Sequence, residues 1–372
     1  MQVRRLLLAL LLFGFLGCSS TTSNQAVSAT ARRSYNGTAS VGDFLNITLD
    51  PAAKTLTYTD VSNGETGVVP YTVNADGTYT LSDPTNNLVA AYEVPNYALL
   101  VQANKTGPGK NVPALITAVL SGQISLATWE GHKYNYMQFR TSSGGLEVGS
   151  VTVDTGGIIN NTSYWPYGAI NQSSPFHTGT MDASAAQADS SGTFFKMPDD
   201  NGNGTFDYVF GTGNGIFAVD TPQGAILGLK QAASKSFDPA FAGTYKAIYY
   251  QKTGATAGVG NVEVGTPGLG SATMTITTDG QVTVQDAQGN TLVPQTALVP
   301  IADTAYLYGS GGQLQDPCFG LFTFRITDVI ASTQQDVFVT FMDRAILFSS
   351  FKTDLPLTQG NAYDYLYGAG LR

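Results

Sequence analysis

Short segments in which apolar and polar residues alternate follow one another from Ser34 onward, and they restrict the fold more than any other feature. Residues 44–49 and 54–59 are two such segments, with a turn at Asp50-Pro51 between them. Turn residues recur about every eight to twelve residues, and the chain has 42 glycines. Alternation with period two places successive side chains on opposite faces of a strand. The sequence therefore predicts an all-β protein of two or three antiparallel barrel or sandwich modules with one short linking helix.

Three hairpins in the chain resemble one another. Residues 88–101, 216–230 and 337–348 each contain an apolar strand, a tight polar turn and a second strand that begins with alanine. Repetition of this kind indicates a modular fold, although one large two-sheet structure is the alternative. The expected organisation is a signal peptide (1–17), a flexible tether (18–31), module one (32–106), a linker (107–129), module two (130–233), module three (240–354) and a C-terminal tail (355–372).

Two stretches do not show the clear strand pattern. In residues 112–122 an apolar run lies between Pro113 and Gly122, and this bracketing predicts a helix of about two turns in the linker. The tail carries three tyrosines, at 363, 365 and 367. For the tail the sequence leaves open either an edge strand or a loose end.

The first eighteen residues have the pattern of an export signal. Arg4 and Arg5 precede an apolar run over residues 6–16, which is too short for a helix across a bilayer, and Gly17-Cys18 ends it. This ending resembles the lipobox of bacterial lipoprotein signal peptides. The resemblance implies that Cys18 is lipidated and anchors the chain in a membrane. Ser19 stands where aspartate often signals inner-membrane retention, which favours the outer membrane, facing the periplasm or the cell surface.

Charge and cysteine content exclude several classes of protein. The net charge is −9, only 12% of residues are charged, and no cluster of lysine and arginine follows the signal. Nucleic-acid binding requires many such cations, so no nucleic-acid partner is expected. The chain has two cysteines. If Cys18 is acylated, Cys318 has no disulfide partner, and its apolar surroundings predict a buried structural thiol.

The most specific local motif is a possible calcium loop within residues 199–207. Its candidate ligands follow the alternating spacing with which calcium loops wrap oxygen atoms around one ion. They are the side chains of Asp199, Asn201, Asn203 and Asp207 and the backbone carbonyl of Thr205. Phe210 replaces the glutamate that usually ends such a loop. The alternative is a hairpin turn without a metal, and any bound Ca²⁺ would be structural rather than catalytic.

Two other groups of residues are weaker candidates. Trp129 and Trp165 are candidates for a sugar-stacking platform, but a core position for Trp129 is favoured. Glu130 and Asp154 are a conceivable glycosidase pair, yet nothing in the sequence brings them together. No catalytic motif is present, and no cofactor other than calcium is expected.

These observations predict a membrane-anchored envelope lipoprotein with a non-catalytic binding or structural role. Its expected partners are the membrane, through the lipid, and an envelope protein or polysaccharide. Two alternatives stay open: a secreted polysaccharide hydrolase, and a lipocalin-like carrier that holds an apolar ligand inside a barrel. A carrier requires an apolar cavity, and a hydrolase requires two carboxylates in a cleft.

Overall fold

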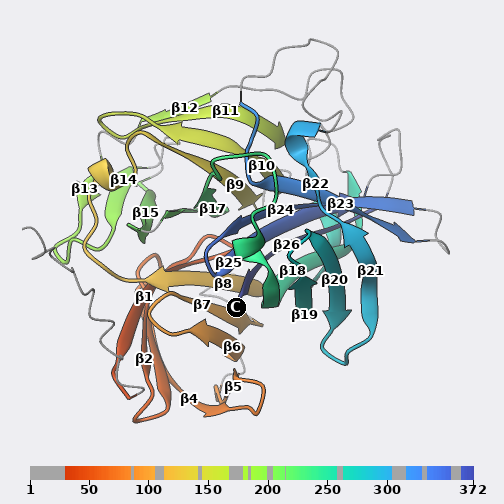
Figure 1. The fold of residues 1–372 in the computed structure, drawn as a ribbon. Helices are drawn as coiled ribbons and strands as arrows, with labels where there is room; N and C mark the ends of the chain where they lie inside the picture. The colour runs from red at the N-terminus through yellow and green to blue at the C-terminus, as the bar shows by residue number, and fades with distance from the viewer. Residues whose placement is uncertain are drawn as a thin grey trace, which may run out of the picture. The chain divides into compact units, whose positions relative to one another are not determined.

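The computed structural model describes residues 30–84, 88–104, 113–140, 145–166, 179–182, 186–198, 204–213, 215–257, 263–303, 316–328, 333–352 and 362–372. Within these ranges the chain forms β-strands and three short 3₁₀ helices, and none of these helices is long and apolar enough to cross a bilayer. Residues 32–372 form one compact unit. The prediction of an all-β fold is confirmed (Figure 1).

Eight strands form a closed antiparallel barrel at the start of this unit, coloured red to yellow in Figure 1. The strands are β1 (Arg33–Ala39), β2 (Phe44–Asp50), β3 (Thr55–Asp60), β4 (Glu65–Val73), β5 (Thr78–Leu81), β6 (Leu88–Val94), β7 (Ala98–Ala103) and β8 (Ala114–Leu120). Consecutive strands pair, and β1 pairs with β8 to close the barrel.

A nine-stranded second sheet follows, after the 3₁₀ helix η1 (Leu126–Thr128). Its strands are β9 (His132–Arg140), β10 (Gly145–Val153), β11 (Ile158–Pro166), β12 (Gly179–Asp182), β13 (Gln187–Ala188), β14 (Phe195–Pro198), β15 (Phe206–Thr212), β16 (Ile216–Thr221) and β17 (Gly224–Lys230). The first strand, β9, pairs with the last, β17.

The third sheet also has nine strands, after η3 (Pro239–Phe241). They are β18 (Gly243–Ala257), β19 (Glu263–Ile276), β20 (Gln281–Asp286), β21 (Thr291–Ala297), β22 (Val299–Pro300), β23 (Leu321–Asp328), β24 (Thr333–Met342), β25 (Ala345–Lys352) and β26 (Ala362–Leu371), with η4 (Ile301–Asp303) after β22. Here too the first strand, β18, pairs with the last, β26.

All three sheets therefore share one topology. Each is an antiparallel meander whose first and last strands pair, and the second and third sheets are open only between their fourth and fifth strands. The three similar hairpins of the sequence are β6–β7, β16–β17 and β24–β25, and each pairs as predicted.

The predicted linking helix is wrong, because residues 114–120 form strand β8 of the first barrel. This strand is buried on both faces. Ala114, Ile116 and Ala118 belong to the barrel interior, whereas Leu115 and Val119 pack outward against the other sheets. A strand covered on both sides has a continuous apolar run, and such a run lacks the alternation that separates strand from helix.

The C-terminal tail is neither an edge strand nor a loose end. Residues 362–371 form β26, which pairs with β18 on one side and β25 on the other. Gly368 lies in this strand, and a side chain there would collide with the Phe348 ring and with Tyr249. The tail is thus the closing strand of the third sheet.

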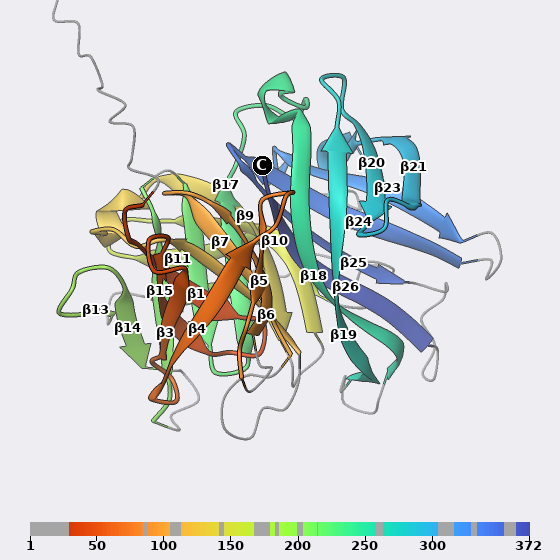
Figure 2. The same cartoon turned by 90° about the horizontal axis from the view of Figure 1, so that it is seen from below.

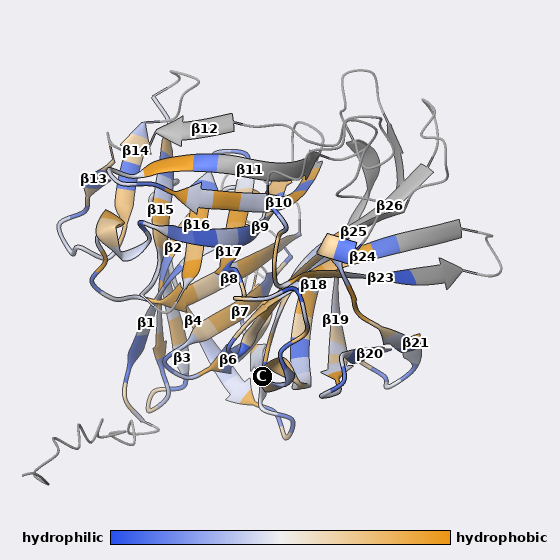
Figure 3. Ribbon diagram, turned by 45° about the horizontal axis from the view of Figure 1, so that its top comes forward, coloured by the Kyte–Doolittle hydropathy of each residue, from blue (hydrophilic) through white to orange (hydrophobic). Residues whose placement is uncertain are grey.

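Each sheet encloses an apolar cluster of its own, and a fourth cluster lies between the sheets. Tyr97 and Leu100 of the first barrel, Phe139 of the second sheet, and Phe338 and Tyr367 of the third sheet all belong to this shared core. Figure 2 shows the three sheets side by side, and Figure 3 shows apolar stretches on strands in the middle of the molecule. Burial of these outer faces joins the sheets into one unit.

Hydrogen bonds between the sheets supplement this packing. The Tyr97 hydroxyl donates to the Met342 carbonyl oxygen at 3.1 Å, which links the first barrel to the third sheet. The Asn36 amide donates to the Thr193 carbonyl oxygen at 2.8 Å, which links the barrel to the second sheet. The sheets therefore have directional as well as apolar contacts with each other.

Candidate functional site: an apolar cavity in the third sheet

The interior of the first barrel is filled by side chains and contains a buried ion pair. Both Glu93 carboxylate oxygens accept hydrogen bonds from Arg33, at 2.6 and 2.8 Å. Tyr35 donates to Oε1 at 2.5 Å, and Tyr79 donates to Oε2 at 2.7 Å. Burial and the neighbouring Glu93 raise the pKa values of both tyrosines above the ordinary range. This network, with the apolar cluster around it, makes the barrel interior a packed core.

The third sheet is packed tightly at only one end. There Phe237 and Phe241 lie against Phe341, with ring centroids 5.5 and 5.9 Å apart, and Phe322 and Tyr245 complete the aromatic layer. Phe241 stacks on Phe341, and the other rings meet Phe341 edge-on or tilted. One end of the third sheet is therefore closed by aromatic side chains.

Beyond this layer the interior contains a cavity of about 230 Å³. Ala247, Ala272, Val284 and Val293 are among its lining residues, and their small side chains leave space in the interior. The remaining lining residues are Tyr249, Gln251, Met274, Leu292, Phe324, Val337, Phe348 and Leu366. Eight strands, β18–β21 and β23–β26, contribute residues to the lining. The cavity is thus a product of the whole sheet and not of any one segment.

Burial distinguishes the floor of the cavity from its mouth. Phe324, Val337 and Phe348 are almost completely buried and form the floor. Tyr249 and Leu366 are partly exposed, and they lie toward the open side. A carrier of an apolar molecule needs such a closed apolar floor beneath an accessible opening.

Leu292 marks the mouth most clearly, because 47% of this large apolar residue is exposed. Gln251, also partly exposed, and the Tyr249 hydroxyl provide uncharged polar groups among the lining residues. Burial and the nearby Asp286 carboxylate raise the pKa of Tyr249, so its hydroxyl stays protonated at neutral pH. The lining includes no charged side chain. These features suit an uncharged ligand.

A second hollow, of about 420 Å³, lies between the first barrel and the third sheet, and it contains two carboxylates, Asp76 and Asp286. A glycosidase pair needs one carboxyl that remains protonated to act as the acid. The Thr78 hydroxyl, with Lys246, lowers the pKa of Asp76, and Asn290 with backbone amides lowers that of Asp286. Both groups are ionised at neutral pH, so this pair lacks the general acid.

The calcium prediction is only partly within the described structure. Asp199, Asn201 and Asn203 lie outside the described residues. Thr205 directly precedes β15, and Asp207 is a buried residue within that strand. The described residues contain no cluster of three or more acidic, histidine or cysteine side chains suited to a metal. The strands on either side, β14 and β15, form the expected hairpin, and calcium binding stays a prediction.

The aromatic and carboxylate candidates of the second sheet have structural positions. Trp129 is 1% exposed and packs edge-on against Phe217 at 5.5 Å, so it is a core residue as favoured. Glu130 accepts a hydrogen bond from the Gly156 amide at 2.8 Å, and Asp154 accepts one from Asn160 at 2.6 Å. Both carboxylates thus serve the β10–β11 turn. The Trp165 side chain lies outside the described residues.

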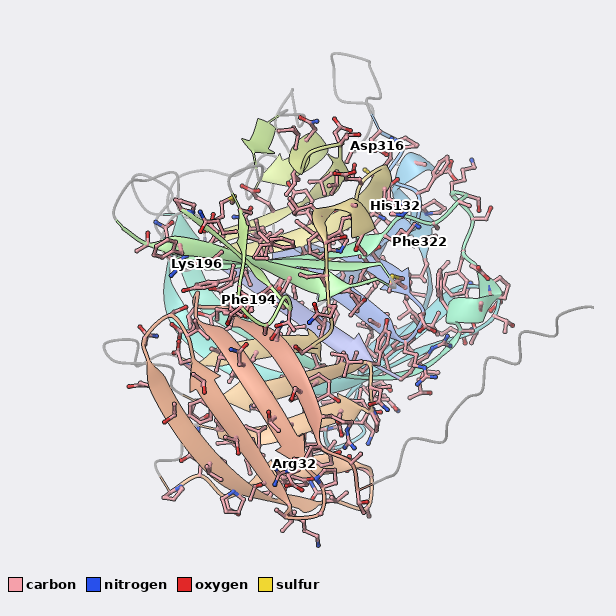
Figure 4. All side chains as sticks on the ribbon, turned by 90° about the vertical axis from the view of Figure 1, so that its left-hand side faces the viewer. Arg32, His132, Phe194, Lys196, Asp316 and Phe322 are labelled. Carbon is pink, nitrogen blue, oxygen red and sulfur yellow. The ribbon has the colours of Figure 1, made fainter. Side chains whose placement is uncertain are left out.

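Cys318 is a buried thiol, as predicted. It adjoins Asp316, which lies between the second and third sheets (Figure 4). The Asp316 carboxylate accepts from the Cys318 amide at 2.8 Å and binds the Lys133 ammonium at 3.0 Å. Burial alone would raise the pKa of Asp316, but these partners lower it below the ordinary value. Cys18 lies outside the described residues.

Comparison with known proteins gives only distant similarities. No protein-family model matches the sequence, and no curated protein matches it. Transferrin binding protein B from Haemophilus parasuis aligns over 92% of this chain and 76% of its own, with 8% identity and a TM-score of 0.29. The Neisseria meningitidis protein of that name aligns over 92% and 75%, with 9% identity and a TM-score of 0.20. A Bacteroides fragilis protein with a provisional outer-membrane description aligns over 66% and 99%, with 12% identity and a TM-score of 0.20. Similarity at this level supports no conclusion about ligand or partner.

Proposed function

We propose that this protein is a lipid-anchored component of the bacterial cell envelope that binds one uncharged hydrocarbon chain in the third sheet, without catalysis. The observation that carries the proposal is the apolar cavity of about 230 Å³ beneath Leu292. The proposed role corresponds to the lipocalin-like carrier named above as an alternative, with its ligand in the third sheet. Anchoring rests on the lipobox-like residues 15–18.

The size of the cavity limits the ligand. Water occupies about 30 Å³ per molecule in the liquid, so the cavity has room for roughly eight groups of that size, such as a segment of about eight methylenes. Each buried methylene contributes about 0.8 kcal/mol, or about 6 kcal/mol in total before the cost of immobilising the chain. Without that cost, about 6 kcal/mol corresponds to a dissociation constant of roughly 0.04 mM, and immobilisation weakens the expected binding to about 0.1 mM or above.

The lining also predicts which head group is preferred. Tyr249 and Gln251 offer a hydroxyl and an amide, and Asp286 places negative charge near Tyr249. A carboxylate head group would approach this negative charge without a cationic partner in the lining. Alcohols are therefore expected to bind more tightly than fatty acids of equal length.

Displacement of the fluorescent probe N-phenyl-1-naphthylamine by 1-decanol and by decanoate tests the binding. Val284→Phe fills the cavity with a ring and is expected to weaken decanol binding at least tenfold. Val299→Phe is the matched control, since Val299 is 41% exposed on the same sheet and outside the lining. Equal displacement in the wild type and Val284→Phe, or a preference for decanoate, would refute the proposed ligand.

The anchor is tested separately by membrane fractionation. Cys18→Ser is expected to release the protein from the membrane fraction, because the acylated thiol is lost. Cys318→Ala removes the other cysteine and is expected to leave the protein in the membrane fraction. Retention of Cys18→Ser with the membranes would contradict the anchoring part of the proposal and leave the binding part intact.

A further inference from the structure

The hollow between the first barrel and the third sheet is formed by two facing polar surfaces. On the barrel, strand pairing sets Thr78 opposite Tyr92 in one row. Thr80, Ala90 and Gln102 form the next row along the same face. This surface follows β5, β6 and β7, which lie beside β18 in Figure 2.

The facing surface belongs to β18 and β19. Pairing sets Lys246 opposite Thr273, and Ile248 opposite Ser271. Together the two surfaces enclose about 420 Å³, which is within the usual range for ligand sites. The hollow thus has hydroxyl groups on both sides, and amide groups on the barrel side.

The charged groups of the hollow are already bound to protein partners. Lys246 Nζ lies 2.9 Å from Asp76 Oδ2 and donates to the Asp76 carbonyl oxygen as well, and it sits 5.4 Å from the centre of the Tyr92 ring. Asp286 accepts three hydrogen bonds within its own turn, from the Gln288 amide and from two nitrogens of Asn290. A ligand therefore meets one ion pair and one carboxylate whose oxygens already accept hydrogen bonds within their own turn.

The uncharged polar side chains of the hollow differ from these charged groups in their hydrogen bonding. Gln102, Ser271 and Thr273 line the hollow, and among the described residues none of their side chains makes a hydrogen bond with protein. The partly exposed Tyr92 ring adds an apolar face beside them. Donors, acceptors and one aromatic face match a neutral molecule that is rich in hydroxyl groups. The negative charge of Asp286 disfavours an anion in the same place.

We infer that this hollow binds a neutral oligosaccharide. A sugar ring would pack against the exposed part of Tyr92 beside Lys246, and its hydroxyl groups would exchange hydrogen bonds with Gln102, Ser271 and Thr273. The Lys246–Asp76 ion pair holds the two surfaces together at one side of the site. This inference is independent of the apolar cavity and of its ligand.

Isothermal titration with maltohexaose, cellohexaose and N-acetylchitohexaose tests the inference on the whole folded chain. At least one probe is expected to bind with a millimolar or lower dissociation constant. Thr80→Trp, which places an indole in the hollow, is expected to weaken that binding at least tenfold, and Gln102→Ala severalfold. Thr57→Trp is the control, because Thr57 is an equally exposed threonine on β3, outside the hollow.

The outcomes test this site without reference to the cavity of the third sheet. Retained saccharide binding in Thr57→Trp together with its loss in Thr80→Trp, with both variants folded by circular dichroism, supports the site. Absence of binding by all three probes overturns it. Equal saccharide affinity in Thr80→Trp and the wild type also overturns it. So does an equal loss of saccharide binding in Thr57→Trp and Thr80→Trp when circular dichroism shows that both variants are folded.

Discussion

The ion pair inside the first barrel provides a quantitative test of how the barrel is stabilised. Glu93→Leu removes a carboxylate whose side chain is fully buried and which accepts two hydrogen bonds from Arg33. The same change removes the acceptor of the Tyr35 and Tyr79 hydroxyl groups. The Arg33 side chain, only 6% exposed, then keeps its charge in the barrel without this partner.

The size of the expected stability loss follows from the burial of both Glu93 and Arg33. Loss of one member of a buried ion pair costs about 3–5 kcal/mol, because the other charge remains desolvated. This cost corresponds to a change of roughly 10² to 10⁴ in the unfolding equilibrium constant. When both charges are replaced by apolar residues of similar size, most of that cost is expected to disappear.

Urea unfolding followed by circular dichroism measures these differences. Glu93→Leu is expected to lower the free energy of unfolding by about 3–5 kcal/mol, and the double variant Arg33→Met/Glu93→Leu is expected to be more stable than Glu93→Leu alone. The reasoning is refuted if Glu93→Leu costs less than about 1 kcal/mol, the range of an exposed pair, or if the double variant is the less stable of the two.

Three further predictions concern the contacts between sheets and the calcium loop. Since the folded-state pKa of Asp316 is lowered, its contribution to stability is present at neutral pH and is lost as the pH falls from about 5 through the folded pKa. Urea unfolding should therefore show that Asp316→Asn loses less stability than the wild type over that pH range. Equal losses in the two proteins would contradict this. Phe139→Ala removes a fully buried ring 4.8 Å from that of Tyr250, and calorimetry should show a loss of about 3–5 kcal/mol in one transition rather than several. Added calcium should raise the melting temperature of the wild type but not of Asp199→Ala, and identical melting curves with calcium and with EGTA would exclude the loop.

The alternation of apolar and polar residues is clearest in the strands with one buried face. In β3, Leu56 points inward and Thr57 outward, so the alternation is visible in the sequence. In β8 both faces are buried by different clusters, and the alternation is therefore absent. The two bracketing residues, Pro113 and Gly122, then favoured the wrong element.

The tail contained a signal that the sequence analysis did not use. Tyr367, Ala369 and Leu371 alternate with glycines and pack into the shared core, so the period of two continues to the end of the chain. This pattern predicts a strand, but only the pairing with β18 and β25 shows that it closes the third sheet.

The candidate sites were beyond local sequence analysis for a physical reason. The lining of the apolar cavity extends from Ala247 to Leu366, and no short motif joins these residues. The polar hollow depends on contact between two sheets, for which the separate strands carry no local sign. Sequence periodicity reports which face of a strand is buried, whereas cavities depend on the sizes of side chains brought together from many strands.

The central claim, that the third sheet holds an uncharged hydrocarbon chain, is tested most directly by locating a heavy-atom ligand. Crystals soaked with 8-bromo-1-octanol and measured at the bromine edge should show anomalous density enclosed by Phe324, Val337 and Phe348. The account predicts that this density is present in the wild type and absent in Val284→Phe. Bromine found only outside the third sheet, or at the same place in both proteins, would contradict it.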